Sequence, residues 1–159
     1  INKKEIGDDR LVNVLYAKKM YIKSIMIIDF GTATTIDVLD KNGDYDGGVI
    51  TPGIDLSLKS LKSGTAKLPL VDFKKTKFVV GKSTINAIKS GFYWGYRSMI
   101  SGLIEKIQFE QNDTFKIIVT GGNSKYFKNC FANVIKIDEF FNTKGLNFLI
   151  NYYLKSIKK

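Results

Sequence analysis

Four consecutive apolar residues, Ile25–Ile28, lead directly into Asp29 and a Gly-Thr turn. A short unbroken apolar run is typical of a β-strand that is covered on both faces. The segment Thr32–Leu39 follows the turn and is rich in β-branched residues, which favour strands. The sequence therefore predicts a second strand that folds back on a buried first strand, so that the polar groups of the turn gather at one end of a hairpin.

An Asn-Gly pair at 42–43 extends this hairpin into a meander. Asn-Gly supplies the positive φ angles of a tight turn, so we expect a third strand at Tyr45–Ile50. Hydrophobic spacing predicts helices at 54–62, 84–107 and 142–156 and from Ser124, strands at 115–119 and 134–137, and a short edge strand at 77–80. Three antiparallel strands followed by alternating helices and strands predict an α/β fold of the ribonuclease H-like type, with one mixed sheet and helices on both faces.

The turn after the first strand concentrates oxygen-bearing side chains. Asp29, Thr32, Thr34 and Thr35 lie within seven residues, and Gly31 stands among them. Glycine lets a backbone approach a ligand closely, while carboxylates and hydroxyls supply the oxygen ligands that hard cations prefer. The group suits a phosphate and metal site. The alternative is that Asp29 is a turn aspartate that accepts hydrogen bonds from its own backbone.

A second group of charged residues precedes the hairpin, in the turn-like segment 6–10. Asp8, Asp9 and Arg10 follow Gly7, and apolar residues then recur at helical spacing. A carboxylate at a helix N-terminus is favoured by the free backbone N–H groups there. Such capping accounts for one aspartate more easily than for two, and it leaves Arg10 without a role.

The composition excludes several kinds of chemistry. The chain has 159 residues, of which 44% are hydrophobic, so it can bury one core and form a single compact domain. It contains no histidine, which excludes Ser-His and Cys-His catalysis and histidine metal ligands. Its one cysteine, Cys130, cannot form an internal disulfide or a cysteine-cluster zinc site. No apolar run is long enough to span a membrane and no signal peptide is visible, so we expect a cytoplasmic protein without a membrane partner.

The chain is strongly basic, with a formal net charge of +10 at pH 7. This balance favours anionic partners such as nucleotides, acidic metabolites or nucleic acid. The lysines are scattered along the chain, however, and form no basic block with interleaved aromatic residues. A nucleic-acid-binding module therefore stays an alternative, and our main expectation includes no nucleic-acid partner.

Five short motifs together resemble one known family. They are Gly7–Arg10, Asp29–Ala33, Gly47–Gly53, Gly81–Thr84 and Thr120–Gly122. In order and spacing they resemble the type III pantothenate kinases, which belong to the superfamily of acetate and sugar kinases, heat-shock chaperones and actin. The resemblance covers essentially the whole chain and implies ATP-dependent phosphorylation of pantothenate to 4'-phosphopantothenate, the first step of coenzyme A biosynthesis.

The resemblance also implies roles for individual residues. Asp9 corresponds to the catalytic general base, and pantothenate is bound by Gly7, Asp8, Asp9, Arg10 and Thr84. The planar guanidinium of Arg10 suits the pantothenate carboxylate. Asp29 corresponds to the ligand of a monovalent cation, K⁺ or NH₄⁺, and Thr32 to an ATP contact. The other implied cofactor is Mg²⁺, and the family forms homodimers in which the neighbour closes the substrate pocket.

The chain departs from the family in two ways. Members begin with a domain whose first strand carries Asp-x-Gly-Asn-Thr, the ATP phosphate loop, and nothing here matches it. We therefore expect residues 1–159 to be the C-terminal domain alone, with 1–23 as substrate loop and linking helix, and to be inactive without the first domain. The family also commonly has a small or apolar residue in place of Asp8, which we expect to face outward.

Several alternatives stay open. The protein could be a catalytically silent, kinase-like regulator or accessory factor. Thr84 could be a plain helix N-cap, and Asp37 could be a strand residue that faces solvent. The long apolar stripe of the helix at 84–107 could form a dimer face or lie wholly inside the core.

Overall fold

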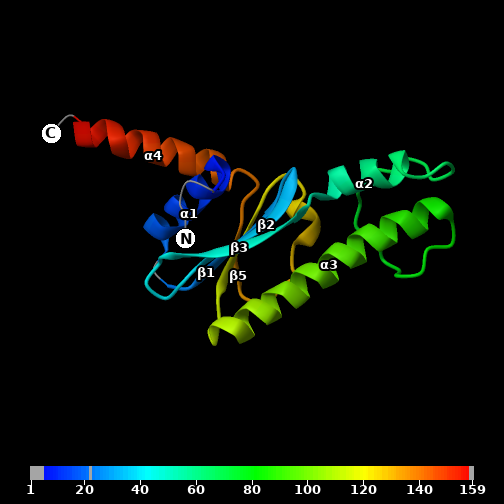
Figure 1. Cartoon of the computed structure of the whole chain (residues 1–159), viewed down its shortest axis with the longest axis horizontal. Coiled ribbons are helices and arrows are strands. Elements are labelled where there is room, and N and C mark those ends of the chain that lie inside the picture. Colours follow the sequence, from blue (N-terminus) through cyan, green and yellow to red (C-terminus); the bar gives the residue numbers. More distant parts are fainter. Residues whose placement is uncertain (1–5, 22, 158–159) are drawn as a thin grey trace.

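A computed structural model of the chain describes residues 6–21 and 23–157, and it contains one five-stranded sheet (Figure 1). The strands are β1 (Ile25–Phe30), β2 (Ala33–Leu39), β3 (Tyr45–Pro52), β4 (Lys116–Thr120) and β5 (Val134–Ile137). The helices are α1 (Asp8–Met20), α2 (Ile54–Ser63), α3 (Thr84–Gln111) and α4 (Phe141–Ile157), and a 3-10 helix, η2, covers Ser124–Phe127. In the described part of the chain, no helix is both long and apolar enough to cross a membrane.

The sheet is mixed, as the sequence predicts. Its strand order is β3-β2-β1-β4-β5. The pairs β1–β2 and β2–β3 are antiparallel and form the meander, whereas β4 and β5 add to the other side of β1 in parallel. The apolar run Ile25–Ile28 thus forms the centre of the sheet, where every one of its side chains is buried.

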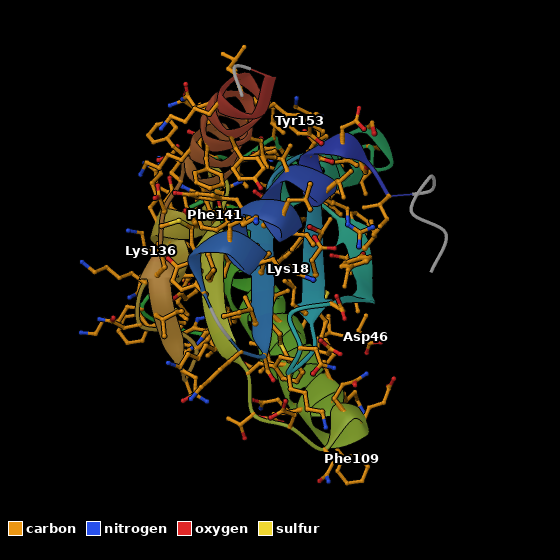
Figure 2. All side chains as sticks on the ribbon, turned by 90° about the vertical axis from the view of Figure 1, so that its left-hand side faces the viewer. Lys18, Asp46, Phe109, Lys136, Phe141 and Tyr153 are labelled. Carbon is orange, nitrogen blue, oxygen red and sulfur yellow. The ribbon has the colours of Figure 1, made fainter. Side chains whose placement is uncertain are left out.

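Helices cover both faces of the sheet because successive strand residues point to opposite sides. Ile25 and Ile27 pack in one cluster with Ala17 of α1 and Phe141 of α4. Met26, Ile28 and Phe30 pack on the other face, where α2 and α3 lie. Figure 1 shows α1 and α4 on one side of the sheet and α3 on the other, and Figure 2 shows α1, which carries Lys18, in front of the strands.

The structure corrects two expectations and shows how the α3 stripe packs. Residues 77–80 form no strand, because the chain there lies against α3, where the Ser90 hydroxyl donates hydrogen bonds to the carbonyls of Phe78 and Val79. The helix predicted from Ser124 is one 3-10 turn. The fully buried apolar side chains of α3 are Ile88, Tyr93, Ile100 and Ile104. Most of the predicted apolar stripe packs half-buried beside them, namely Phe92, Tyr96, Met99, Leu103 and Ile107.

Candidate active site

The first turn of α1 carries both aspartates of the Gly-Asp-Asp-Arg motif. Gly7 is the N-cap residue, and Asp8 and Asp9 follow it with exposed side chains, as we expect for Asp8. The Asp9 carboxylate accepts a hydrogen bond from the backbone N–H of Arg10 at 2.9 Å. Asp9 therefore stands at a helix start where a bound molecule can reach it.

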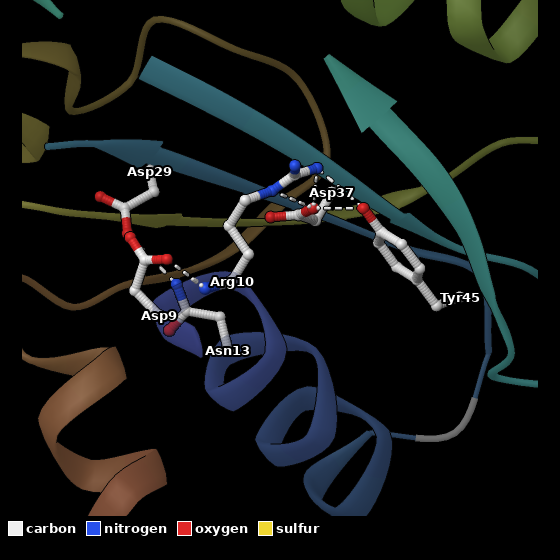
Figure 3. A network of polar contacts seen from close by, with 6 residues as sticks. All are labelled: Asp9, Arg10, Asn13, Asp29, Asp37 and Tyr45. Carbon is white, nitrogen blue, oxygen red and sulfur yellow. Dashed lines mark hydrogen bonds and ion pairs between the residues drawn. The ribbon is translucent and has the colours of Figure 1, made fainter. Parts of the chain in front are cut away.

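Arg10 points from α1 into the sheet and meets two side chains there (Figure 3). Its Nε and Nη2 donate to Asp37 Oδ1 at 2.9 and 2.6 Å, and Nη2 also donates to the Tyr45 hydroxyl at 2.7 Å. The Tyr45 hydroxyl donates to the same Asp37 oxygen at 3.0 Å. Asp37 is fully buried, so the expectation that it faces solvent is wrong. The reason is that α1 covers the face of β2 on which Asp37 lies.

Gly48 makes room for this ion pair. It is the β3 partner of Asp37, and a Cβ atom at this position would lie 2.8 Å from Arg10 Nη2 and 2.1 Å from the Ile36 carbonyl. Glycine inside a strand often marks a close approach of another group, and at Gly48 that group is the Arg10 side chain.

Burial dominates the electrostatics of this network. It raises the pKa of Asp37, although the hydrogen bond and charge of Arg10 lower it. Burial and the Asp37 charge raise the pKa of Tyr45 to about 12, so Tyr45 stays a neutral hydrogen-bond donor. Because two N–H donors of Arg10 bind the buried Asp37 carboxylate, the guanidinium anchors α1 to the sheet.

Asp29 lies at the end of β1, next to the start of α1 (Figure 3). Its Oδ2 accepts a hydrogen bond from Asn13 Nδ2 at 3.2 Å, and among the described residues no backbone N–H donates to it. The alternative in which Asp29 binds its own backbone is thus wrong. Burial raises the pKa of Asp29, and the charges of Asp9 and Asp37 raise it further, although Asn13 lowers it.

Two asparagines that sequence reasoning missed connect the aspartates. Asn13 is only 1% exposed, although it is polar. Asn142 of α4 donates from Nδ2 to Asn13 Oδ1 at 3.3 Å and to the backbone carbonyl of Asp9 at 2.7 Å. One sequence signal could have pointed to Asn13: it is a polar residue one helical turn after Asp9, next to Val14 and Ala17 on the buried side of α1.

The residues around Asp29 fit a monovalent cation. A Cβ atom at Gly121 would lie 2.4 Å from Asp29 Oδ1, and one at Gly31 would lie 3.3 Å from it. Both glycines thus keep side chains away from a carboxylate oxygen. Within residues 6–21 and 23–157, no three histidine, cysteine or acidic side chains are grouped to hold a metal. Asp29 thus offers an uncovered carboxylate oxygen, the kind of ligand that hard, oxygen-preferring cations take.

Thr32 lies beside a pocket of about 440 Å³ at the same end of the sheet. The pocket is bounded by the turn after β1, the turn after β4 and the first residues of α2. Its lining residues are Phe30, Gly31, Thr32, Asp55, Leu56, Lys59, Gly122 and Asn123. The structure thus joins Thr32 to the Gly121-Gly122 turn, which lies far from it in sequence.

Thr84 is placed differently from the other expected site residues. It is the exposed first residue of α3, and the N-cap is Ser83, whose hydroxyl accepts from the Asn86 N–H at 3.2 Å. The N-cap alternative for Thr84 is therefore wrong. This end of α3 lies on the far side of the molecule from α1 (Figure 1), so one chain does not bring Thr84 and Asp9 together.

The architecture and the site define an α/β protein with a carboxylate-bearing polar site at one end of a mixed sheet. A profile of the type III pantothenate kinase family matches residues 1–106. The chain belongs to the type III pantothenate kinase family.

Individual relatives agree with this assignment. The chain is 44% identical to the type III pantothenate kinase of Pelagibacter ubique over 149 residues, 92% of this chain and 58% of the relative. It is 42% identical to that of a Sulfurihydrogenibium species over 151 residues, 95% of this chain and 60% of the relative. The chain thus spans about three fifths of the length of these relatives.

A solved structure from Campylobacter jejuni shares the fold. This conserved protein, assigned to the Baf family of transcriptional activators, superimposes with a TM-score of 0.64 over 98% of this chain and 68% of its own. Its sequence identity is 21%, so the likeness concerns the fold alone.

Proposed function

We propose that the protein containing this chain transfers the γ-phosphate of Mg-ATP to pantothenate, the first step of coenzyme A biosynthesis. The observation that carries this proposal is the placement of Asp9. Its carboxylate is exposed at a helix start, while Arg10 anchors that start to the sheet and Asn142 holds the Asp9 carbonyl. Family membership supplies the substrate class.

Asp9 acts as the general base in this proposal. Phosphoryl transfer to a primary alcohol needs a carboxylate that orients the hydroxyl and accepts its proton in a loose transition state. A solvent-accessible carboxylate on an anchored segment meets that need. Gly7, Asp8 and Arg10 shape the pantothenate loop, and Arg10 acts chiefly as its anchor because Asp37 already takes two of its donors.

The nucleotide occupies the other side of Asp29. Thr32 contacts ATP from the pocket that it shares with Gly122, and Asp29 binds K⁺ or NH₄⁺ beside the nucleotide phosphates. The glycines that flank Asp29 Oδ1 support this role. Mg²⁺ accompanies the ATP phosphates, which a separate phosphate-loop domain holds.

The same proposal covers the assembly. The described residues belong to one ribonuclease H-like domain of the actin-like ATPase superfamily, in a cytoplasmic homodimer. Residues 1–23 are proposed as substrate loop and linking helix, and of these, 1–5 and 22 lie outside the described part of the chain. Two observations support the dimer. Thr84 lies far from Asp9 within one chain, and the neighbouring Phe78, Val79 and Val80 are at least 64% exposed. In such a dimer, Thr84 of one copy would have to reach Asp9 of the other for both to contact the same pantothenate.

A coupled ATP-consumption assay on the whole protein tests the proposal. Turnover should require pantothenate, and Asp9→Asn should abolish it without unfolding the protein, because the amide keeps the volume and loses the proton acceptor. Asp72→Asn, at an exposed carboxylate outside the candidate site, is the matched control and should keep the activity. Near-normal turnover of the Asp9 variant would contradict the base assignment.

The alternatives predict different results in the same experiments. A catalytically silent regulator would show no pantothenate-dependent ATP consumption. A nucleic-acid-binding module would bind random DNA with an affinity that falls steeply as salt rises.

A further inference from the structure

Thr120, the last residue of β4, carries a hydroxyl that the described structure leaves without a partner. The residue is 1% exposed, and its Oγ1 is buried and makes no hydrogen bond to any described residue. Burying a hydroxyl without a partner is unfavourable, so most buried hydroxyls in proteins are paired. The Thr120 hydroxyl therefore indicates a partner from outside the described residues.

The sheet register places this hydroxyl beside Asp29. The parallel strands β1 and β4 pair Asp29 with Thr120. Paired residues of neighbouring strands project from the same face of a sheet. That face is the one under α1, because Ile118, two residues before Thr120, packs with Ile25 and Ile27 against Ala17.

The two oxygens of the Asp29 carboxylate have different surroundings. Oδ2 accepts the hydrogen bond from Asn13, which fixes the rotation of the carboxylate. Oδ1 accepts no hydrogen bond from the described residues and lies against Gly31 and Gly121. Gly121 has a φ of 87°, and any side chain there would collide with Oδ1. An uncommitted carboxylate oxygen and an uncommitted hydroxyl thus share one end of the sheet.

We propose that Thr120 supplies a second side-chain oxygen to the monovalent cation site whose carboxylate is Asp29. This inference rests on the cation role of Asp29 in the proposed function. A hydroxyl oxygen offers a lone pair to a hard cation without adding charge. The Thr120 hydroxyl then adds a neutral oxygen beside the Asp29 carboxylate, and the hydrogen bond from Asn13 to Oδ2 leaves Oδ1 free to face the ion.

Cation binding itself provides the test. The thermal midpoint of this chain is measured against KCl at constant ionic strength, balanced with tetramethylammonium chloride, and K⁺ activation of the whole protein is measured in parallel. Thr120→Val, which removes the hydroxyl and keeps the shape, should raise the half-saturating K⁺ concentration at least tenfold. Thr120→Ser, which keeps an oxygen, should stay within about threefold of wild type.

Thr34→Val is the matched control. Thr34 is also 1% exposed, and its Oγ1 also lacks a hydrogen-bond partner among the described residues. It pairs with Phe30, however, and so lies on the opposite face of the sheet. Its variant should leave the half-saturating K⁺ concentration unchanged, and Thr120→Ala replaces the valine variant if that variant does not fold.

The variant Asp29→Asn distinguishes the cation role of Asp29 from the ligand role of Thr120. It should abolish the K⁺-dependent shift. If it does so while Thr120→Val keeps the wild-type half-saturation, the Thr120 inference is overturned and the cation role of Asp29 stands. Wild-type half-saturation in Thr120→Val is also the expected result if the Thr120 hydroxyl serves only to donate a hydrogen bond to Asp29. If Asp29→Asn keeps the full K⁺ response, both the cation role and the inference fail.

Discussion

The buried pair of Arg10 and Asp37 offers the sharpest test of how α1 is held on the sheet. We consider Asp37→Leu, which keeps a similar volume and removes the carboxylate. The side chains of Arg10 and Asp37 are 14% and 1% exposed, and their closest atoms are 2.6 Å apart. The variant therefore leaves a largely buried guanidinium without its counter-charge and the Tyr45 hydroxyl without its acceptor.

The expected loss of stability follows from this geometry. Removing one partner of a buried ion pair costs about 3–5 kcal/mol. The exposed part of Arg10 can recruit water, so we expect the lower end, about 3 kcal/mol. For a chain of this size each kcal/mol lowers the thermal midpoint by about 2–4 °C, which predicts a shift of about 6–12 °C. A typical stability of about 5–15 kcal/mol leaves the variant folded.

Urea and thermal denaturation of this chain measure the effect, and two further variants make it specific. Lys18→Met breaks an exposed ion pair with Asp44 of the same length, 2.6 Å, and should cost only about 0–1 kcal/mol. The double variant Arg10→Met/Asp37→Leu should recover most of the loss, because neither charge is then buried.

Two outcomes would refute this reasoning. An Asp37→Leu variant within about 1 kcal/mol of wild type would show that the pair does not anchor α1. A double variant no more stable than the single one would show that the loss comes from packing and not from the unpaired charge.

Two further predictions concern the residues around Asp29. Because burial raises its pKa above 3.8, Asp29 stabilises the fold below that pH, and this contribution is lost as the pH rises through the higher pKa of the folded state. Asp29→Asn should therefore be more stable than wild type at pH 7 and lose less stability between pH 4 and pH 7 in urea titrations; an unchanged pH dependence would contradict this. Gly121→Ala should destabilise the chain, because φ is 87° and the new Cβ would lie 2.4 Å from Asp29 Oδ1, whereas Gly91→Ala in α3, with no neighbouring atom within 4 Å, should stabilise it by about 0.5–1 kcal/mol in thermal denaturation. Equal effects of the two glycine variants would show that Gly121 is not needed to leave room for Asp29 Oδ1.

The sequence by itself determined most of the secondary structure and the family. The apolar run Ile25–Ile28 predicted the central strand, and Asn42-Gly43 predicted the turn of the meander, because both signals are local. Local signals failed at 77–80, where a short apolar stretch has no strand to pair with, and at Ser124, where the chain turns too tightly for an α-helix.

The connections within the site required the tertiary structure. The sequence shows that Asp37 and Thr120 belong to apolar strand segments, but it does not say that α1 covers their face. That coverage makes Asp37 the partner of Arg10, and register alone places Thr120 beside Asp29. Asn13 links two segments through bonds that no spacing encodes. The sequence thus predicted which carboxylates form the candidate site, and packing decided which groups lie against them.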